Sequence, residues 1–375
     1  MTISRRSLLK SAAAVGALAA SAEVFAPAIA QNKPVRIGIL APRSGIAAAP
    51  GENGIRATQW AVERFNAGGG IAGRKVELVI EEESSPKDTI ERFGKLVQQE
   101  KVDCVQGIIS TGAGLALGPV VEEARALTIY WDGTTQDGVD EKLPNPRYLF
   151  RSTDNECEAI MSSKVGTMDL TSHVAALKAA KPDLIFSSLL FADLPVFMKQ
   201  AHAAELTKDS KLVFPAAGWQ HTLMKKEFTP EGILFGHNTF YFDNPNGSPL
   251  AKEFVAWYER TYKDYPEWEA DRAYFAIASY KAAVENAAKA KNGSWPSQDD
   301  VIEAMAGLSV ESLGGKGAWR KDHIAEQTFV QGLTTHNNKY DFVTLGSFET
   351  MYASDLQKPP GANFWDWIKT AQFKI

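Results

Sequence analysis

A regular alternation of apolar strands and amphipathic helices constrains the fold of this chain more than any other feature. After an N-terminal segment, strands are expected at residues 35–40, 76–81, 102–109 and 127–131. Helices are expected between them, at residues 54–66, 86–100 and 115–126. The helices are recognised by apolar residues at helical spacing, such as Ile90, Phe93 and Val97. Strict alternation predicts a parallel sheet that is covered by helices on both faces.

The same alternation resumes in the second half of the chain. Elements are expected at residues 170–180, 183–188, 194–204, 211–215 and 231–238, then helices at 249–262, 270–291 and 299–306, then strands within 325–348. A length of 375 residues is enough for two domains. The sequence therefore predicts an α/β protein with two doubly wound parallel-sheet lobes. Such sheets bind ligands at the carboxyl ends of their strands, so a site is expected in a cleft between the lobes.

The first thirty residues have the pattern of an export signal. Arg5 and Arg6 open a charged region, a short apolar run follows, and Ala28 and Ala30 offer a cleavage site. The paired arginines are typical of a twin-arginine signal. A membrane anchor is the alternative, but the apolar run is shorter than the ~20 residues that cross a bilayer. We expect a signal peptide at residues 1–30 and a periplasmic mature protein.

Charge and cysteine content exclude several functional classes. The net charge of −5 argues against general nucleic-acid binding, which needs clustered Lys and Arg. Two cysteines cannot build a disulfide framework or a cysteine-rich metal site. Cys104 and Cys157 are interpreted as two thiols, with a disulfide between them as the alternative. The six histidines have no metal-binding spacing, so no metal site is expected.

The loop after the third expected strand is the first candidate site. Ser110, Thr111, Gly112 and Ala113 lead into a helix, whose start presents unpaired N–H groups and the positive end of the helix dipole. This loop is predicted to hold a carboxylate, with a simple helix cap as the alternative. A dinucleotide site is a second alternative, because Asp132 follows Gly112 by 20 residues. Its glycine spacing is one residue too long, and it follows the third strand and not the first.

Further candidates follow other strands. Trp131, Asp132, Gly133 and Thr134 could receive the polar end of a ligand beside a stacking face. In the second half, apolar and aromatic residues at three strand ends predict an aromatic-lined pocket: Leu190, Phe191, Trp219 and Tyr241. Packing in the core is the alternative for these residues. The acidic run at 81–83 is interpreted as a solvated cluster and not as a catalytic pair.

Several of these segments resemble the leucine/isoleucine/valine-binding proteins, which are type I periplasmic solute-binding proteins of ABC importers. The matching segments are residues 35–40, 41–45, 68–74, 81–87, 148–152, 177–183 and 270–283. The resemblance implies a two-lobed clamp that is joined by three crossovers and closes on a small ligand. The implied N-terminal lobe is 31–150 with 243–331, and the C-terminal lobe is 151–242 with 332–375.

The resemblance also implies partners and residue roles. Such proteins bind a small molecule and dock on the membrane permease of an ABC transporter. No enzymatic activity, cofactor or nucleic acid is expected, and the protein is expected to be a monomer. The ligand carboxylate would be held by loops 110–113 and 132–134, with Thr111 and Thr134 as the main candidates. An aromatic residue that members often place after a second-lobe strand falls at Leu190, with Phe191 beside it.

The chain departs from the family where an acid usually meets the ammonium of an amino acid. The matching loop is 216–219, and it holds Ala217 in place of an acid. Burying an ammonium without a counter-charge is costly. An aromatic or other hydrophobic carboxylic acid is therefore favoured over an α-amino acid, while amides and urea stay open. The alternative functions are an exported nucleotide-dependent oxidoreductase and a sensor protein of the same fold that binds an amide or urea.

A second departure concerns length. Between residues 156 and 168 the family continues with a helix, a strand, another helix and another strand, whereas this chain has only the short segment 158–166. On the order of 30–50 residues, about one βαβ unit, are missing. Losing such a unit exposes sheet edges and apolar faces, so the second lobe is expected to be less stable than that of a full-length relative.

Overall fold

The computed structural model describes residues 33–132, 138–139, 142–143, 145–152, 166–352, 354 and 357–372. The chain divides into a short N-terminal unit, Met1–Pro34, and a large unit, Val35–Ile375. The expected export signal at 1–30 lies outside the described residues, as does the short segment 158–166 except for its last residue, Gly166. The described residues of the large unit form three sheets with their helices.

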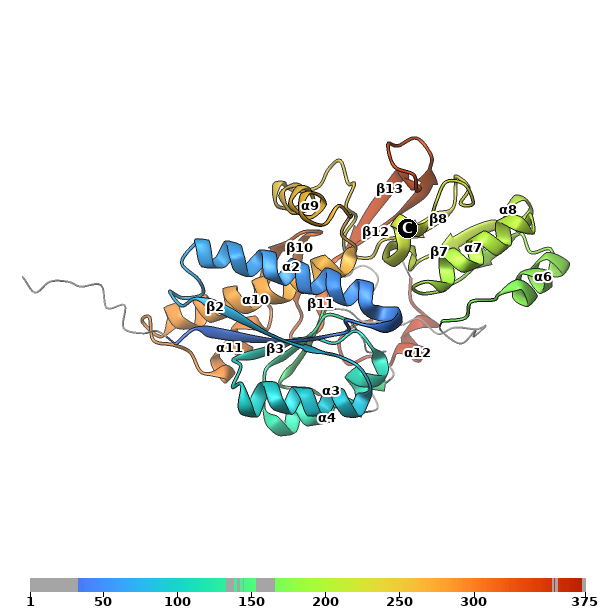
Figure 1. Cartoon of the computed structure of the whole chain (residues 1–375). Coiled ribbons are helices and arrows are strands. Elements are labelled where there is room, and N and C mark those ends of the chain that lie inside the picture. Colours follow the sequence, from blue (N-terminus) through green and yellow to red (C-terminus); the bar gives the residue numbers. More distant parts are fainter. Residues whose placement is uncertain are drawn as a thin grey trace, which may run out of the picture. The chain divides into compact units, whose positions relative to one another are not determined.

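The first sheet is entirely parallel, with strand order β2-β1-β3-β4-β5 (Figure 1). Its strands are β1 (Val35–Ala41), β2 (Val76–Glu82), β3 (Cys104–Gly107), β4 (Thr128–Tyr130) and β5 (Leu149–Arg151). The predicted alternation of strands and helices is confirmed here. Consecutive parallel strands need a crossover helix, which explains why the alternation could be recognised from apolar spacing.

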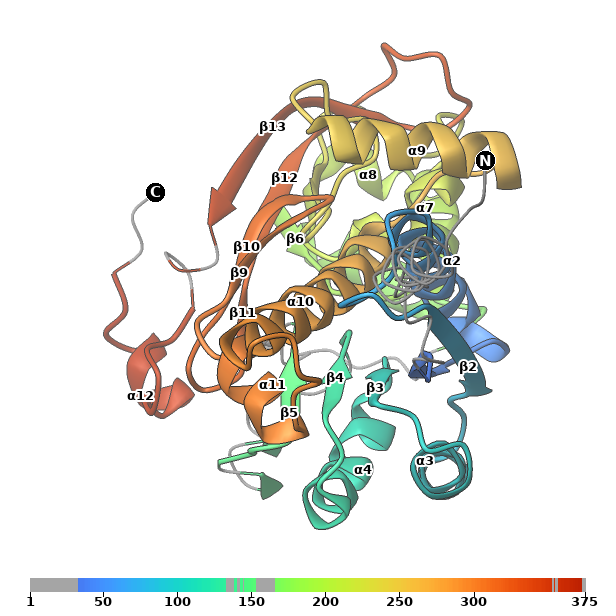
Figure 2. The same ribbon diagram turned by 90° about the vertical axis from the view of Figure 1, so that its left-hand side faces the viewer.

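Helices cover both faces of the first sheet, as Figure 2 shows. One face carries α3 and α4, and the other carries α2 and α10. Their bounds, with those of the smaller neighbours, are α2 (Ala48–Ala67), α3 (Pro86–Gly94), the π-helical turn η2 (Lys95–Gln99), α4 (Thr111–Ala124), α10 (Trp268–Ala290), α11 (Gln298–Met305) and the 3₁₀ turn η1 (Gly45–Ala47). Within the described part of the chain, none of the strands β1–β5 exposes a large apolar side chain.

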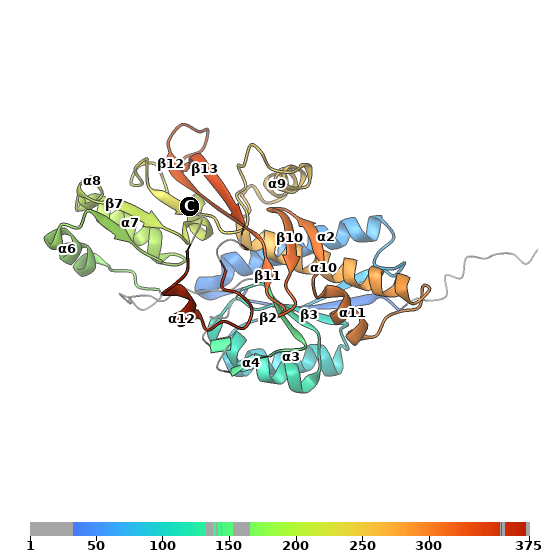
Figure 3. The same cartoon turned by 180° about the vertical axis from the view of Figure 1, so that it is seen from behind.

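The second sheet is mixed, with strand order β13-β12-β8-β7-β6 (Figure 3). Its strands are β6 (Leu184–Phe186), β7 (Lys211–Phe214), β8 (Leu234–Gly236), β12 (Thr328–Thr335) and β13 (Thr344–Tyr352). The first three are parallel, whereas β12 is antiparallel to both β8 and β13. The α/β class with parallel sheets is thus confirmed, and the late strands add an antiparallel edge to the second sheet.

One face of the second sheet is buried. Ile185 pairs with Leu212, Phe214 pairs with Phe235, and all four side chains are buried. Phe197 of α7 packs edge-on against Phe214, with 6.1 Å between ring centroids. The helices associated with this sheet are α6 (Thr171–Ala180), α7 (Asp193–Ala203), α8 (Leu206–Asp209) and the 3₁₀ segment η3 (Ala217–Leu223).

The opposite face of the second sheet is apolar and open. Phe186 pairs with Val213, Val213 with Leu234, and Leu234 with Leu333, so these four side chains form one stripe across four strands. Phe186 is 64% exposed, Leu333 is 45% exposed, and Leu184, on the same face of β6, is 53% exposed. Parallel strands are normally covered on both faces. This stripe is the clearest structural difference between the two sheets.

A third, antiparallel sheet and two further helices complete the described chain. The sheet consists of β9 (Ser309–Ser312), β10 (Gly315–Trp319) and β11 (Ala325–Glu326). The helices are α9 (Pro249–Tyr262) and α12 (Phe364–Ile368). The ring of Trp319 in β10 packs on Phe275 of α10 with 5.0 Å between centroids. Strands β9 and β10 were not expected from the sequence, because their glycines and polar residues resemble a loop.

Candidate functional site

The start of α4 has the geometry expected of an anion-binding loop. Ser110 precedes the helix in an extended conformation, and its side chain does not cap the helix. The first intrahelical bond runs from the Gly114 N–H to the Ser110 carbonyl, at 2.8 Å. Among the described residues, the N–H groups of Thr111, Gly112 and Ala113 have no hydrogen-bond partner. Three unpaired donors at a helix start favour a negatively charged group.

Glu83 fixes the position of this loop. It is buried at the end of β2, and its carboxylate accepts the N–H groups of Ile109 and Ser110, both at 2.8 Å. Burial raises the pKa of Glu83 to about 7, while the two N–H donors oppose that rise. The interpretation of 81–83 as a solvated cluster is therefore wrong for Glu83. The strand end turns this one carboxylate inward, past β1, toward the loop that follows β3.

Asp132, at the end of β4, forms a buried ion pair. Its carboxylate lies 2.7 Å from the guanidinium of Arg272 in α10, and both side chains are almost fully buried. The guanidinium in turn lies over the ring of Trp268, 5.0 Å from its centroid. The Asp132 carboxylate is thus already paired with Arg272, and this pairing weakens the assignment of Asp132 as a ribose-binding acid. Gly133 and Thr134 lie outside the described residues.

Trp131 is packed in the core and does not offer an open face. Its side chain is fully buried, and a Cβ added at Gly54 of α2 would lie 2.3 Å from the Trp131 ring. A glycine at this position of α2 therefore gives the indole its space. This environment agrees with the alternative in which Trp131 packs in the core and offers no stacking face to a ligand.

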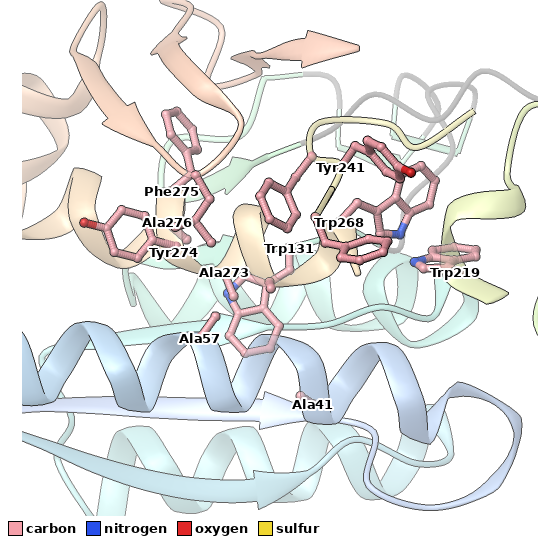
Figure 4. Packing of buried hydrophobic residues seen from close by; sticks show 14 of the residues in the cluster. Ala41, Ala57, Trp131, Trp219, Tyr241, Trp268, Ala273, Tyr274, Phe275 and Ala276 are labelled. Atoms are coloured by element: carbon pink, nitrogen blue, oxygen red, sulfur yellow. The ribbon is translucent and has the colours of Figure 1, made fainter. Parts of the chain in front are cut away.

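Two of the predicted aromatic residues meet. Phe191 stacks on Trp219 with 4.9 Å between centroids and an interplanar angle of 12°. Trp219 also packs edge-on against Trp268, again at 4.9 Å. Phe191 is half-buried and adopts φ = 52°, a left-handed backbone conformation that is uncommon for an aromatic residue. Figure 4 shows Trp219, Trp268 and Trp131 following one another from η3 toward α2.

The other two predicted pocket residues behave differently. Leu190 is half-buried beside Phe191, and its carbonyl accepts the Asp193 N–H at 3.2 Å at the start of α7. Tyr241 is buried and makes its ring contacts elsewhere, 4.6 Å from His237 and 5.3 Å from Phe242. The Tyr241 hydroxyl accepts the N–H of Leu345, 3.0 Å away. Tyr241 therefore does not join the Phe191–Trp219 stack.

The first turn of α10 brings further acids to this region, which the sequence analysis missed. Glu269 is fully buried, and neither carboxylate oxygen has a hydrogen-bond partner among the described residues. Burial raises the pKa of Glu269 to about 8, Arg272 opposes this rise, and Asp132 and Glu83 add to it. The helix was expected to begin at residue 270, which left Glu269 in a loop. No sequence signal marks this residue, because an acid directly before an expected helix gives no sign of its burial.

Asp271 ties α10 to the connections between the sheets. Its buried carboxylate accepts the Gly314 N–H at 2.8 Å and the Gln327 amide at 3.2 Å. Thr328, next to Gln327, donates its hydroxyl to the Thr239 carbonyl at 3.0 Å. The chain passes between the first and second sheets after β8, near Thr239, and again before β12, near Gln327. Helix α10 therefore anchors both of these connections.

The described residues contain no group of three or more His, Cys, Asp and Glu side chains that could hold a metal ion. Within the same residues, no helix combines the length and the apolar character that crossing a membrane would need. The site therefore consists of helix-start N–H groups, buried acids with one arginine, and stacked aromatic rings.

The family model described as periplasmic binding protein matches residues 34–164 and 162–332. The chain belongs to the periplasmic binding protein family. Its members are binding proteins, and the predicted resemblance is confirmed. The relatives include Leu/Ile/Val-binding protein homolog 7 of Brucella abortus, 23% identical over 72% of this chain and 79% of its own. An amino acid binding protein of Pseudomonas aeruginosa is 33% identical, but the match spans only 29% of each chain.

Solved structures of solute-binding proteins share the fold. One is a solute-binding protein of an ABC transporter from Rhodopseudomonas palustris BisB5 in complex with 3,4-dihydroxybenzoic acid. It has a TM-score of 0.72 and 20% identity, over 88% of this chain and 99% of its own. Another is the branched-chain amino acid-binding protein LivJ of Streptococcus pneumoniae with isoleucine. It has a TM-score of 0.68 and 21% identity, over 85% of this chain and all of its own.

Proposed function

We propose that the mature chain is an extracytoplasmic receptor of an ABC importer that binds a small aromatic or hydrophobic carboxylic acid. The observation that carries this proposal is a series of contacts between the helix start and the aromatic stack. Glu83 holds the loop before α4, and the Asp132 N–H donates to the Ile108 carbonyl, at the start of that loop, at 3.1 Å. Asp132 pairs with Arg272, and Arg272 lies on Trp268, which touches Trp219. An anion-binding helix start and an aromatic wall at one site fit an aromatic acid.

The comparisons support the aromatic class without deciding it. Structural neighbours are in complex with 3,4-dihydroxybenzoic acid, benzoate and p-hydroxybenzoic acid, while another is in complex with isoleucine. Ala217, in the loop where the family places an acid, is buried in η3. An α-amino acid would lack its usual counter-charge from that loop, which favours an acid without an ammonium group.

The proposed mechanism is a shift between open and closed lobes. The ligand carboxylate binds the N–H groups of Thr111, Gly112 and Ala113, with the Thr111 hydroxyl and, in the loop 133–134, Thr134 as further donors. The ring packs on Phe191 and Trp219 from the other lobe. Because both contacts form only when the lobes are closed, binding shifts the population toward the closed state. The closed protein then docks on the permease as a monomer, without a cofactor or a chemical step.

We further propose that the lobes are residues 31–150 with 243–331, and residues 151–242 with 332–375, and that the second lacks about one βαβ unit. The open apolar stripe on β6, β7, β8 and β12 supports this. The family match consists of two segments, 34–164 and 162–332, which meet within the segment 158–166 where the deletion is expected. The alignment with homolog 7 runs over 333 residues but uses 72% of this chain, about 270 residues, so about 60 positions lack a counterpart here.

A thermal-shift screen of residues 31–375 tests the function. Benzoates should raise the melting temperature, because a ligand that binds only the native state stabilises it. Thr111→Val should weaken benzoate binding about tenfold by removing one charge-assisted hydrogen bond. Thr171→Val, at the start of α6, is the matched control and should leave binding unchanged. Stabilisation by NAD(P) instead of the acids would replace this proposal with the oxidoreductase alternative.

A further inference from the structure

Glu269 is a buried acid to which the described residues offer no hydrogen-bond partner. Three other buried acids of this region have partners: Glu83 accepts two N–H groups, Asp132 pairs with Arg272, and Asp271 accepts from Gly314 and Gln327. Glu267 has one buried oxygen without a partner among the described residues, whereas Glu269 has two. Both oxygens of Glu269 are buried, and the described residues offer neither of them a hydrogen bond. A buried polar group without a partner is costly and rare, so this carboxyl requires an explanation.

The position of Glu269 points to a ligand. The residue before it, Trp268, packs on Trp219, which belongs to the loop that holds Ala217 where an acid was expected. On the other side, the charges that act on Glu269 are those of Arg272, Asp132 and Glu83, and Glu83 holds the loop before α4. Glu269 therefore follows a residue of the aromatic cluster directly and lies within electrostatic reach of Glu83 and Asp132.

We propose that Glu269 determines specificity by pairing with a hydroxyl group on the ligand's aromatic ring. The inference rests on the proposed function and narrows its substrate class to hydroxylated aromatic acids. A phenolic hydroxyl can donate to a carboxyl oxygen, so it provides the partner that the protein does not. An unsubstituted ring would leave the same carboxyl without a partner and would bind more weakly for that reason.

The surrounding charges favour a hydroxyl over an ammonium as the partner. Burial raises the pKa of Glu269 to about 8, which favours the uncharged form of the carboxyl. The acids that influence it are Asp132 and Glu83, its one positive neighbour is Arg272, and Glu267 lies two residues before it. An uncharged carboxyl can both accept and donate a hydrogen bond, which matches a hydroxyl. It provides no counter-charge for an ammonium group.

Calorimetric titration of the mature protein and its variants tests the assignment. The probes are benzoate, the three monohydroxybenzoates and phenylalanine, and the readout is the affinity ratio of the best hydroxybenzoate to benzoate. The ratio is used because a general loss of affinity cancels from it. In the wild-type protein the ratio should be at least about tenfold. In Glu269→Leu it should fall to about one, and in Glu269→Gln, which keeps the size and a hydrogen-bonding group, it should lie between.

Glu267→Gln is the matched control. Glu267 is also a buried acid at the start of α10, and its N–H donates to Asn53 at 3.0 Å. Its substitution should leave the ratio unchanged. Should Glu269→Leu not fold, the Glu269→Gln ratio decides alone.

The outcomes separate this inference from the proposed function. A ratio that stays the same in both Glu269 variants overturns the role of Glu269 and leaves the receptor for aromatic acids intact. Binding of phenylalanine that depends on Glu269 also overturns it, because the partner would then be an ammonium group. If no benzoate binds the wild-type protein, the proposed function fails and this inference fails with it.

Discussion

The two large sheets of this protein differ in how completely their apolar surface is covered. Helices lie on both faces of the first sheet, and its described strands expose no large apolar side chain. The second sheet buries Phe214 and Phe235 on one face, while Phe186 and Leu333 remain largely exposed on the other. Both sheets contribute to the proposed site. The comparison teaches that residues of a proposed binding site can be retained beside a sheet of which one face is partly exposed to solvent.

Breaking the buried ion pair beside the complete sheet should have the largest effect. Asp132→Ala would leave the Arg272 guanidinium buried without its carboxylate, which costs about 3–5 kcal/mol of stability. Denaturant unfolding of the variant measures this loss. The control is Glu52→Gln, because Glu52 pairs with Arg43 on the surface at 3.1 Å and should contribute less than about 1 kcal/mol. Equal losses in the two variants would contradict the importance given to the buried pair.

Restoring the βαβ unit that we propose to be missing should reduce the difference between the sheets. A βαβ segment from a full-length relative, inserted at residues 158–166, should cover Leu184, Phe186 and Leu333. Covering each of these half-exposed side chains contributes about 1 kcal/mol, so the gain should be about 3 kcal/mol. The melting temperature of the insertion variant measures it. No gain from a correctly folded insertion would mean that the second sheet is already complete.

The two regions should respond to pH in opposite directions. Near the first sheet, burial raises the pKa values of Glu83 to about 7 and of Glu269 to about 8. Their contribution to stability is present in full below about pH 4.5 and is lost as the pH rises through 7 to 8. In the second region, burial lowers the pKa of His221 to about 4 and that of His237 well below its usual value. Their contribution is present above about pH 6.5 and is lost as the pH falls toward 4.

Unfolding free energies between pH 4.5 and 8.5 separate these two responses. Glu269→Gln should stabilise the protein at pH 8.5 relative to wild type and flatten the alkaline side of the profile. His221→Phe should flatten the acidic side, because it removes the imidazole that takes up a proton. A phenyl ring should fit there, because the His221 ring stacks on aromatic neighbours such as Phe242, 4.8 Å away. A His221→Phe profile that keeps the full acidic loss would show that other groups cause it.

Polar substitutions on the open stripe should have the smallest effect on stability. Phe186→Ser should change the free energy of unfolding by no more than about 0.5 kcal/mol, because most of the ring is already in solvent. It should also reduce self-association, since exposed apolar faces promote aggregation. Light scattering during heating measures the second effect. Phe214→Ser, in the buried face of the neighbouring strand, is the contrasting variant and should cost several kcal/mol.

Local patterns were sufficient to predict the order of strands and helices, because each apolar stripe reports the face that an element buries. They also indicated the helix start at Ser110–Ala113 and the meeting of Phe191 with Trp219. They were insufficient for Glu83 and Glu269, because an acid in a polar run or before a helix gives no sign of its burial. Trp131 could not be placed either, since the space for its ring comes from Gly54, distant in the sequence.

Hydrogen exchange of residues 31–375, with and without a hydroxybenzoate, tests the account most directly. Without ligand, β6 and β7 should exchange much faster than β1 and β3, because they have less cover. With ligand, amides of residues 111–113 and of 190–191 should both become slower, since one molecule contacts both lobes. Equal protection of the two sheets without ligand, or slowing of only one of the two loops with it, would contradict the account.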